Sequence, residues 1–298
     1  MHTETDRGAI FMMLLCAALW SIAGLFIKAI PWNPLVIAGA RSLVASAVVL
    51  LYMRARGMRP RFGRGALRSG VMLCLTFMAF VTANKLTTSA NTIVLQYSAP
   101  VFIMVISAVA FRQRFRRADY WVVGITVLGI ALCFLDKLAA GNMLGNLIAV
   151  LSGLFLAGMY VATGRTDETQ RMSGILLGHL LTAAIGLPLM LVFPTPLTGP
   201  ALVNISILGV FQLGIPYVIY GVAAGRCTPL VACLVGVAEP LLNPLWVFLF
   251  GGEAPGIMAI IGGAVVVAAV TVWCVRDAKS KQSTKKIPAA MPESEIRT

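Results

Sequence analysis

Three ionisable side chains interrupt otherwise apolar stretches of the chain: Arg41, His179 and Glu239. A charged side chain inside a membrane span costs about 2.5–3.5 kcal/mol on insertion scales, so it is expected to face a cavity or a polar partner. Glu239 could bind a cationic group or a proton, or it could cap backbone donors beside Pro240. Arg41 could pair with a carboxylate, bind one from a substrate, or be a buried strut bonded to loop carbonyls. His179 fits an interhelical hydrogen bond better than a proton relay.

Two of the apolar stretches carry a polar face and a proline. At 100° per residue, the polar residues of 88–111 lie within about 20° of one line, and those of 228–250 lie within roughly 60°. The two faces consist of Ser89, Gln96, Pro100 and Ser107, and of Pro229, Gly236, Glu239, Pro240 and Asn243. A proline leaves the carbonyl four residues earlier without its helical donor, which creates a weakened, hydrated position. Such helices are typical of transporter binding sites, although a proline can also be a simple kink.

Aromatic and amide side chains accompany these stretches. Phe77, Phe80 and Asn84 share one helix face, and Gln212 shares another with Pro216. An apolar cavity lined by aromatic rings and a few amides suits amphipathic solutes, and the alternative for the aromatics is a belt at the membrane surface. The candidate binding residues are Trp20, Phe77, Phe80, Asn84, Gln96, Tyr97, Pro100, Gln212, Glu239, Pro240 and Asn243, with Arg41 and His179 as further ionisable candidates.

The composition indicates that these residues lie in membrane-spanning helices. Of the 298 residues, 59% are hydrophobic and 12% charged, with a mean hydropathy of +0.88, whereas a soluble domain carries about 25% charge. The long apolar runs exclude a soluble protein, a disordered chain and a disulfide-stapled fold, and their continuity excludes a β-barrel. We expect an all-α membrane protein with ten spans, at 8–27, 34–53, 67–86, 88–111, 118–135, 143–163, 172–193, 201–224, 228–250 and 255–275.

The basic residues are unequally distributed between the two sets of connecting loops. Of the 24 lysines and arginines, twenty lie at the termini or in loops on one side of the expected spans, and only Lys28, Lys85 and Lys137 lie on the other. The positive-inside rule therefore predicts that both termini are cytoplasmic. The net charge of +13 follows from this topology. The basic loops can contact anionic lipid headgroups, but without interleaved aromatics they do not indicate a nucleic-acid partner.

A weak internal repeat relates the two halves of the chain. With a shift of 140 residues Pro100 matches Pro240, and with a shift of 139 residues 34–39 match 173–178. Because each copy has five helices, an odd number, the second copy enters the membrane from the opposite side. Such inverted repeats would place a substrate near the bilayer midplane between the copies and allow alternating access. The expected parts are a cytoplasmic N-terminus at 1–7, five-helix repeats at 8–135 and 143–275, and a disordered basic cytoplasmic tail at 276–298.

The chain resembles the drug/metabolite transporter (DMT) superfamily, in its EamA-like group. The residues that carry this resemblance are Ser-Ala-Pro-Val-Phe at 98–102 and Ala-Glu-Pro-Leu at 238–241. A finer similarity, to the bacterial aromatic amino acid exporter (YddG-type) branch, rests on Trp20, residues 84–92, Gln96-Tyr97 and Gly-Gly-Glu at 251–253. Many EamA-like members have Gly-Glu after both matching helices. Here Arg112-Gln113 follows the first, which weighs against a pair of matching glutamates.

The resemblance implies the EamA-like fold of two inverted repeats and export of aromatic and other neutral amino acids, or similar small metabolites, across a bacterial inner membrane. Export of drugs or of cationic or nucleotide-like metabolites is the alternative within the superfamily. An intramembrane enzyme is a remote alternative, because the chain has no HExxH, GxSxG or nucleotide-binding motif. We expect a monomer that needs no cofactor and no metal.

Overall fold

The computed structural model describes residues 6–87, 89–133, 143–239, 241–242 and 257–285, and all regular secondary structure in these residues is helical. The 3₁₀ segment is η2 and the π-helix is η3. The elements are α1 (Arg7–Trp20), α2 (Ala23–Ala29), α3 (Pro34–Ala55), α4 (Arg64–Leu86), α5 (Ser89–Gln96), α6 (Ala99–Phe111), α7 (Arg117–Cys133), α8 (Met143–Thr163), α9 (Glu168–Gly186), η2 (Leu187–Leu191), α10 (Gly199–Ile207), η3 (Leu208–Gly214), α11 (Ile215–Ala223), α12 (Pro229–Gly236) and α14 (Ile257–Lys285).

Within the described residues, 6 helical segments are long and apolar enough to cross a membrane. Each of them coincides with one of the ten expected spans. They are Arg7–Ala29, Pro34–Ala55, Arg64–Leu86, Met143–Thr163, Glu168–Leu191 and Gly199–Ala223. Large apolar side chains on the outside of the bundle are exposed, as contact with lipid requires; Val109 is 80% exposed and Trp121 72%. The chain is therefore a multi-pass helical membrane protein.

The last helix extends further than the sequence indicated. A disordered tail was expected from residue 276, but α14 continues to Lys285. Residues 276–285 contain good helix formers and neither glycine nor proline, so nothing in this segment ends the helix. At 1.5 Å per residue a helix of 29 residues is about 43 Å long, which exceeds the roughly 30 Å of a bilayer core. The expectation of disorder was wrong for 276–285, and residues 286–298 lie outside the described residues.

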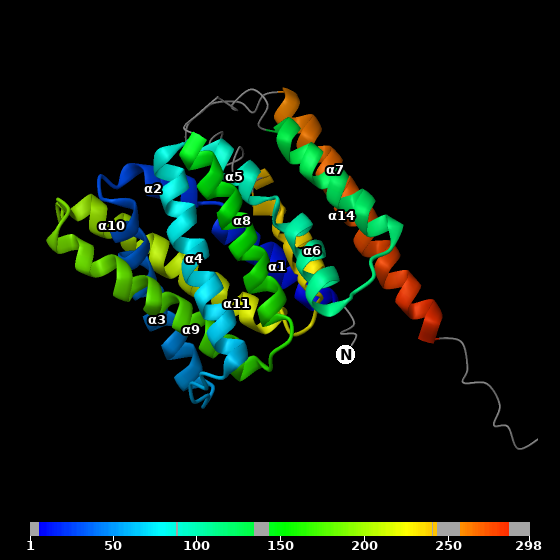
Figure 1. The fold of residues 1–298 in the computed structure, drawn as a ribbon, viewed down its shortest axis with the longest axis horizontal. Helices are drawn as coiled ribbons and strands as arrows, with labels where there is room; N and C mark the ends of the chain where they lie inside the picture. Colours follow the sequence, from blue (N-terminus) through cyan, green and yellow to red (C-terminus); the bar gives the residue numbers. More distant parts are fainter. Residues whose placement is uncertain (1–5, 88, 134–142, 240, 243–256, 286–298) are drawn as a thin grey trace, which may run out of the picture.

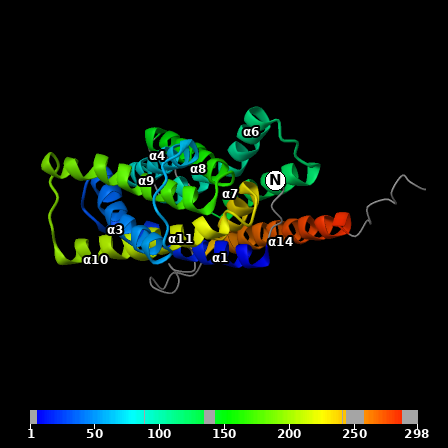
Figure 2. The ribbon, with the colours of Figure 1, turned by 90° about the horizontal axis from the view of Figure 1, so that it is seen from below.

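The helices form two layers with a pair of helices beside them. Helix α4 packs against both α8 and α9, and α9 packs against α3. In Figure 2 α4, α8 and α9 lie on one side, and α1, α10 and α11 lie on the other. Helix α3 joins the layers, because it contacts both α9 and η3. Helices α7 and α14 pack mainly on each other, at the edge of the molecule in Figure 1.

Several helices begin at residues that the sequence supplies for that purpose. The side chain of Asn33 accepts a hydrogen bond from Leu35 N (2.9 Å) at the start of α3, whose first residue is Pro34. Asp167 accepts from Gln170 N (2.9 Å) at the start of α9. Such caps bind backbone donors that the first helical turn leaves free.

The expected span at 88–111 consists of two helices rather than one. Helix α5 ends at Gln96, and α6 begins at Ala99, where the backbone N–H groups of Val101 and Phe102 donate to Ser98 O (3.0 and 3.3 Å). The cause is Pro100, which has no N–H to donate to the carbonyl of Gln96. The proline was expected to weaken one continuous helix, and in the structure it divides that helix into two. The expected span at 8–27 is also divided, between α1 and α2.

Close backbone approach joins α3 to α9. A Cβ atom built on Gly39 would lie 2.8 Å from the Cα of Gly186, and one built on Gly186 would meet the carbonyl of Leu35. Only glycine permits this spacing, because backbone atoms stand on both sides of the contact. Small residues at helix contacts are a common basis of packing in membranes.

We predict that Gly39→Ala lowers the free energy of unfolding by about 1–3 kcal/mol, because the added methyl group must push α3 away from α9. The measurement is the melting temperature of the purified protein in detergent. Gly124→Ala is the matched control, since a Cβ at Gly124 of α7 meets no atom within 4 Å. Equal melting temperatures for the two variants would refute the close contact.

Candidate functional site

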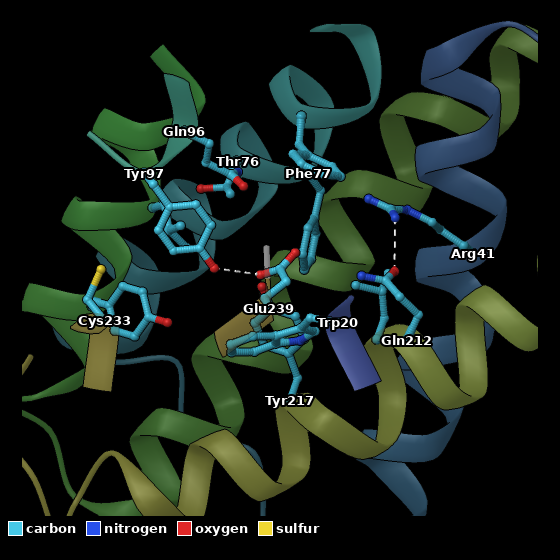
Figure 3. A pocket seen from close by; sticks show the side chains of 14 residues that line it. Trp20, Arg41, Thr76, Phe77, Gln96, Tyr97, Gln212, Tyr217, Cys233 and Glu239 are labelled. Carbon is cyan, nitrogen blue, oxygen red and sulfur yellow. Dashed lines mark hydrogen bonds between the residues drawn. The ribbon is translucent and has the colours of Figure 1, made fainter. Parts of the chain in front are cut away.

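A small cavity lies in the middle of the bundle, where the interrupted helices meet (Figure 3). Its volume is about 50 Å³, which is enough for a few water molecules. Both layers of helices contribute to its wall. The lining residues are Trp20, Arg41, Thr76, Phe77, Phe80, Gln96, Tyr97, Leu156, Tyr160, Gln212, Leu213, Tyr217, Cys233 and Glu239.

Most of the candidate residues lie together in this wall. Those that line the cavity are Trp20, Arg41, Phe77, Phe80, Gln96, Tyr97, Gln212 and Glu239. Asn84 and Pro100 are buried but do not line it. His179 lies behind Phe77, in contact with the ring. Pro240 and Asn243 lie outside the described residues.

One wall of the cavity is a cluster of aromatic rings from α1, α4 and α11. The ring centroid of Tyr217 is 5.3 Å from that of Trp20, and 5.2 Å from that of Phe77 in an edge-to-face arrangement. The indole N–H of Trp20 has no hydrogen-bond partner among the described residues. The rings hold each other in place, and Trp20 retains one unused donor beside the cavity.

His179 packs against this aromatic wall and makes no interhelical hydrogen bond to the part of the chain that the structure describes. Its ring stacks on Phe77 (5.0 Å between centroids, 18° between planes) and meets Tyr217 edge-on at 5.6 Å. The side chain is fully buried. The expected hydrogen bond is therefore replaced by ring contacts.

Arg41 reaches the cavity from α3 and binds a neutral partner. Its Nη1 donates to Oε1 of Gln212 (3.0 Å), and its guanidinium lies 5.7 Å from the centre of the Phe77 ring. Arg41 is 1% exposed. The observed partner of Arg41 is a side chain on η3, so Arg41 is not the strut bonded to loop carbonyls that the sequence also allowed.

Glu239 follows α12 and lines the cavity beside Tyr97. The Tyr97 hydroxyl lies 2.9 Å from Oε2 of Glu239 and 2.8 Å from the carbonyl oxygen of Gly236. The hydroxyl has a single proton for two acceptors, so one of them is incompletely bonded when Glu239 is ionised. Figure 3 shows this pair on one side of Phe77 and the Arg41–Gln212 pair on the other.

Gln96 holds α5 against α8 next to the helix interruption. Its Nε2 donates to Oγ of Ser152 (2.7 Å), and Ser152 Oγ lies 3.4 Å from the carbonyl of Thr76 on α4. A Cβ at Gly153 would lie 2.6 Å from the carbonyl oxygen of Gln96. Helix α8 thus covers the carbonyl that Pro100 leaves without a helical donor, and Gln96 is a structural as well as a lining residue.

Sequence reasoning missed several lining residues, among them Thr76, Tyr160 and Cys233. Thr76 is four residues before Phe80 on α4, so the face already identified there could have included it. Cys233 lies in α12, which is apolar on all sides, so no periodicity singles out one face. Tyr160 shares a face of α8 with Ser152 and Thr163, and that face could have indicated it.

The lining groups are suited to binding rather than to a chemical step. Among the described residues they comprise aromatic rings, two amides, hydroxyls, one guanidinium and one carboxylate. In the described ranges, no three His, Cys, Asp or Glu side chains are placed to hold a metal ion. A solute with an apolar body and a few polar groups fits such a wall.

Residues 7–135 match the EamA-like transporter family. The chain is 25% identical over 246 residues to a protein named pseudopaline exporter CntI of Pseudomonas aeruginosa strain UCBPP-PA14, which covers 81% of this chain and 85% of that protein. The protein of the same name from strain PAO1 is 25% identical over 248 residues, with the same shares covered. These similarities support a transporter and not an enzyme.

A solved crystal structure has the same fold. It superposes with a TM-score of 0.76 at 21% sequence identity, and the match covers 93% of this chain and 100% of the other. The fold is therefore shared over nearly the whole length of both chains.

We predict that Gln96→Ala lowers the free energy of unfolding by about 1–3 kcal/mol, since it leaves the buried hydroxyl of Ser152 without its donor. Thermal melting in detergent measures the loss. Ser206→Ala serves as the control, because Ser206 is exposed and its hydroxyl donates to Leu202 O of its own helix. If Gln96→Ala melts like the control, Gln96 does not hold α5 to α8.

Proposed function

We propose that this protein is a bacterial inner-membrane exporter of aromatic and other neutral amino acids, or of similar small metabolites, which acts as a monomer by alternating access. The observation that carries the proposal is the cavity at which interrupted helices converge. Helices α1 and α5 end at it, α12 ends close to Glu239, and η3 is a π-helical turn within a longer helix. Interrupted helices at the centre of a bundle are typical of transporter binding sites.

The wall of the cavity supports a solute of amino-acid type. Aromatic rings provide an apolar surface, while Arg41 and Glu239 place opposite charges on the two sides of Phe77 in Figure 3. A purely cationic drug would suit Glu239 but would be repelled by Arg41. The relatives named pseudopaline exporters support export of a metabolite, and the amino-acid class is our own inference.

The proposal includes ten spans in two inverted repeats, 8–135 and 143–275, with both termini in the cytoplasm. Loops expected in the cytoplasm meet at one end of the bundle. Asp6 N donates to Arg226 O (3.1 Å), and Arg61 N donates to Ser173 Oγ (2.8 Å). These bonds join four segments that lie in or next to the basic loops.

Segments expected outside the cytoplasm meet in the same way. Lys85 Nζ donates to Ile30 O (2.7 Å), and Trp32 Nε1 donates to Pro196 O (2.9 Å). The grouping of the connections into two sets agrees with an orientation set by the positive-inside rule.

Cysteine labelling tests this orientation. In a cysteine-free background, we expect a membrane-impermeant maleimide to label Thr198→Cys in intact cells and to label Arg59→Cys only after the membrane is opened. Both positions are exposed in loops, so the reagent's access to them differs only by the side of the membrane on which they lie. Labelling of Arg59→Cys in intact cells would reverse the topology.

Flux through proteoliposomes tests the function itself. We expect purified protein to equilibrate labelled L-phenylalanine across liposomes faster than protein-free liposomes do, and an imposed pH gradient to leave the plateau unchanged. The reason is that a solute that accumulates in the cell can leave down its own gradient without coupled protons.

Two outcomes would contradict this prediction in different ways. Absence of flux for every neutral amino acid tested would refute the proposed substrate class. Accumulation driven by the pH gradient and abolished by Glu239→Gln would instead make Glu239 a proton-coupling site and refute uncoupled flux.

A further inference from the structure

Arg41 is a buried guanidinium that has no counter-ion among the residues that the structure describes. The ion pair that the structure shows among these residues joins Arg226 to Asp6 and lies at the surface. The Nε of Arg41 has no hydrogen-bond partner in the same residues, and Nη1 bonds to a neutral amide. Burial of an uncompensated charge is costly, so a site of this kind favours binding of an anion.

Gln212 adds a second donor to the same corner of the cavity. Its side-chain oxygen accepts from Arg41, which leaves its NH₂ group as the free end of the amide. Both side chains line the cavity, and Figure 3 shows them facing each other. A guanidinium and an amide NH₂ together present only N–H groups, which complement the oxygens of a carboxylate.

The π-helix η3 brings Gln212 to Arg41. Gly209 in this segment lies directly against α3, where a Cβ would meet the Val44 side chain and, at 2.9 Å, the carbonyl oxygen of Arg41. The glycine therefore lets η3 approach the turn of α3 that carries Arg41. π-Helical turns inside α-helices occur frequently at functional sites.

The charge of the cavity wall defines the kind of anion. Arg41 is the one cationic side chain among the lining residues that the structure describes, so it balances a single negative charge. The Glu239 carboxylate on the other side of Phe77 disfavours a second one. A carboxylate on an apolar or aromatic body satisfies these conditions better than a doubly charged phosphate.

We propose that Arg41 and Gln212 form a carboxylate-binding subsite, and that the solute is a small monocarboxylate of amino-acid type. That the bound carboxylate belongs to a transported solute rests on the proposed function. Binding itself can be measured without transport.

The test is the thermal stabilisation of purified protein in detergent by 3-phenylpropionate, which carries a carboxylate and no ammonium. We expect it to raise the melting temperature of the wild type. Phenethylamine, which carries an ammonium and no carboxylate, is the matched probe, because the N–H donors of the Arg41–Gln212 pair offer its ammonium no acceptor. Absence of stabilisation of the wild type by 3-phenylpropionate overturns the subsite.

Gln212→Glu is the decisive variant, because it gives Arg41 a carboxylate from the protein itself. We expect this variant to fold, to melt at a higher temperature without ligand, and to bind 3-phenylpropionate at least about tenfold more weakly. Gln170→Glu, the same change in a partly exposed residue of α9 away from the cavity, should bind as the wild type does. Full binding by Gln212→Glu overturns the subsite.

Arg41→Lys provides a second variant that keeps the charge but loses the planar fork of donors. We expect weaker binding of 3-phenylpropionate with the effect of phenethylamine unchanged. If carboxylates bind in this way but no solute crosses proteoliposomes, the proposed function fails and the subsite stands. If amino acids are transported but neither variant changes the binding of 3-phenylpropionate, the subsite fails and the proposed function stands.

Discussion

The constraint on which this structure depends is that a backbone group released from a helix inside a membrane must be covered by protein. Pro100 releases the carbonyl of Gln96 in the middle of the bundle. Helix α8 approaches that carbonyl through Gly153 and bonds to Gln96 through Ser152. The interruption that creates the cavity is thus the same feature that requires the close packing around it.

Two kinds of contact hold the helices together in different parts of the molecule. Glycine contacts hold α3 against α9, so these helices are fixed relative to each other. The rings of Trp20, Phe77 and Tyr217 connect α1, α4 and α11 through side chains only. Ring contacts can slide more easily than backbone contacts, and the helices that they join are among those that line the cavity.

Much of the cavity could be predicted from residue types and spacing. Arg41 and Glu239 were found because a charge in an apolar span needs a polar environment, and Phe77 and Phe80 because they share a helix face. Asn84 shares that face but lies one turn beyond Phe80, about 6 Å along the helix, so a shared face did not specify depth. The π-helix at Leu208–Gly214 could not be predicted, since the segment contains no proline and nothing in its sequence distinguishes it from an α-helix.

The small volume of the cavity has a consequence for turnover time. An amino acid is larger than a cavity of about 50 Å³, so the proposed function requires the surrounding helices to separate and close again for every solute molecule. Collective helix motions take microseconds to milliseconds. Under the proposed alternating access, the solute therefore moves in discrete steps, each as slow as a rearrangement of packed helices, rather than in a continuous stream limited by diffusion.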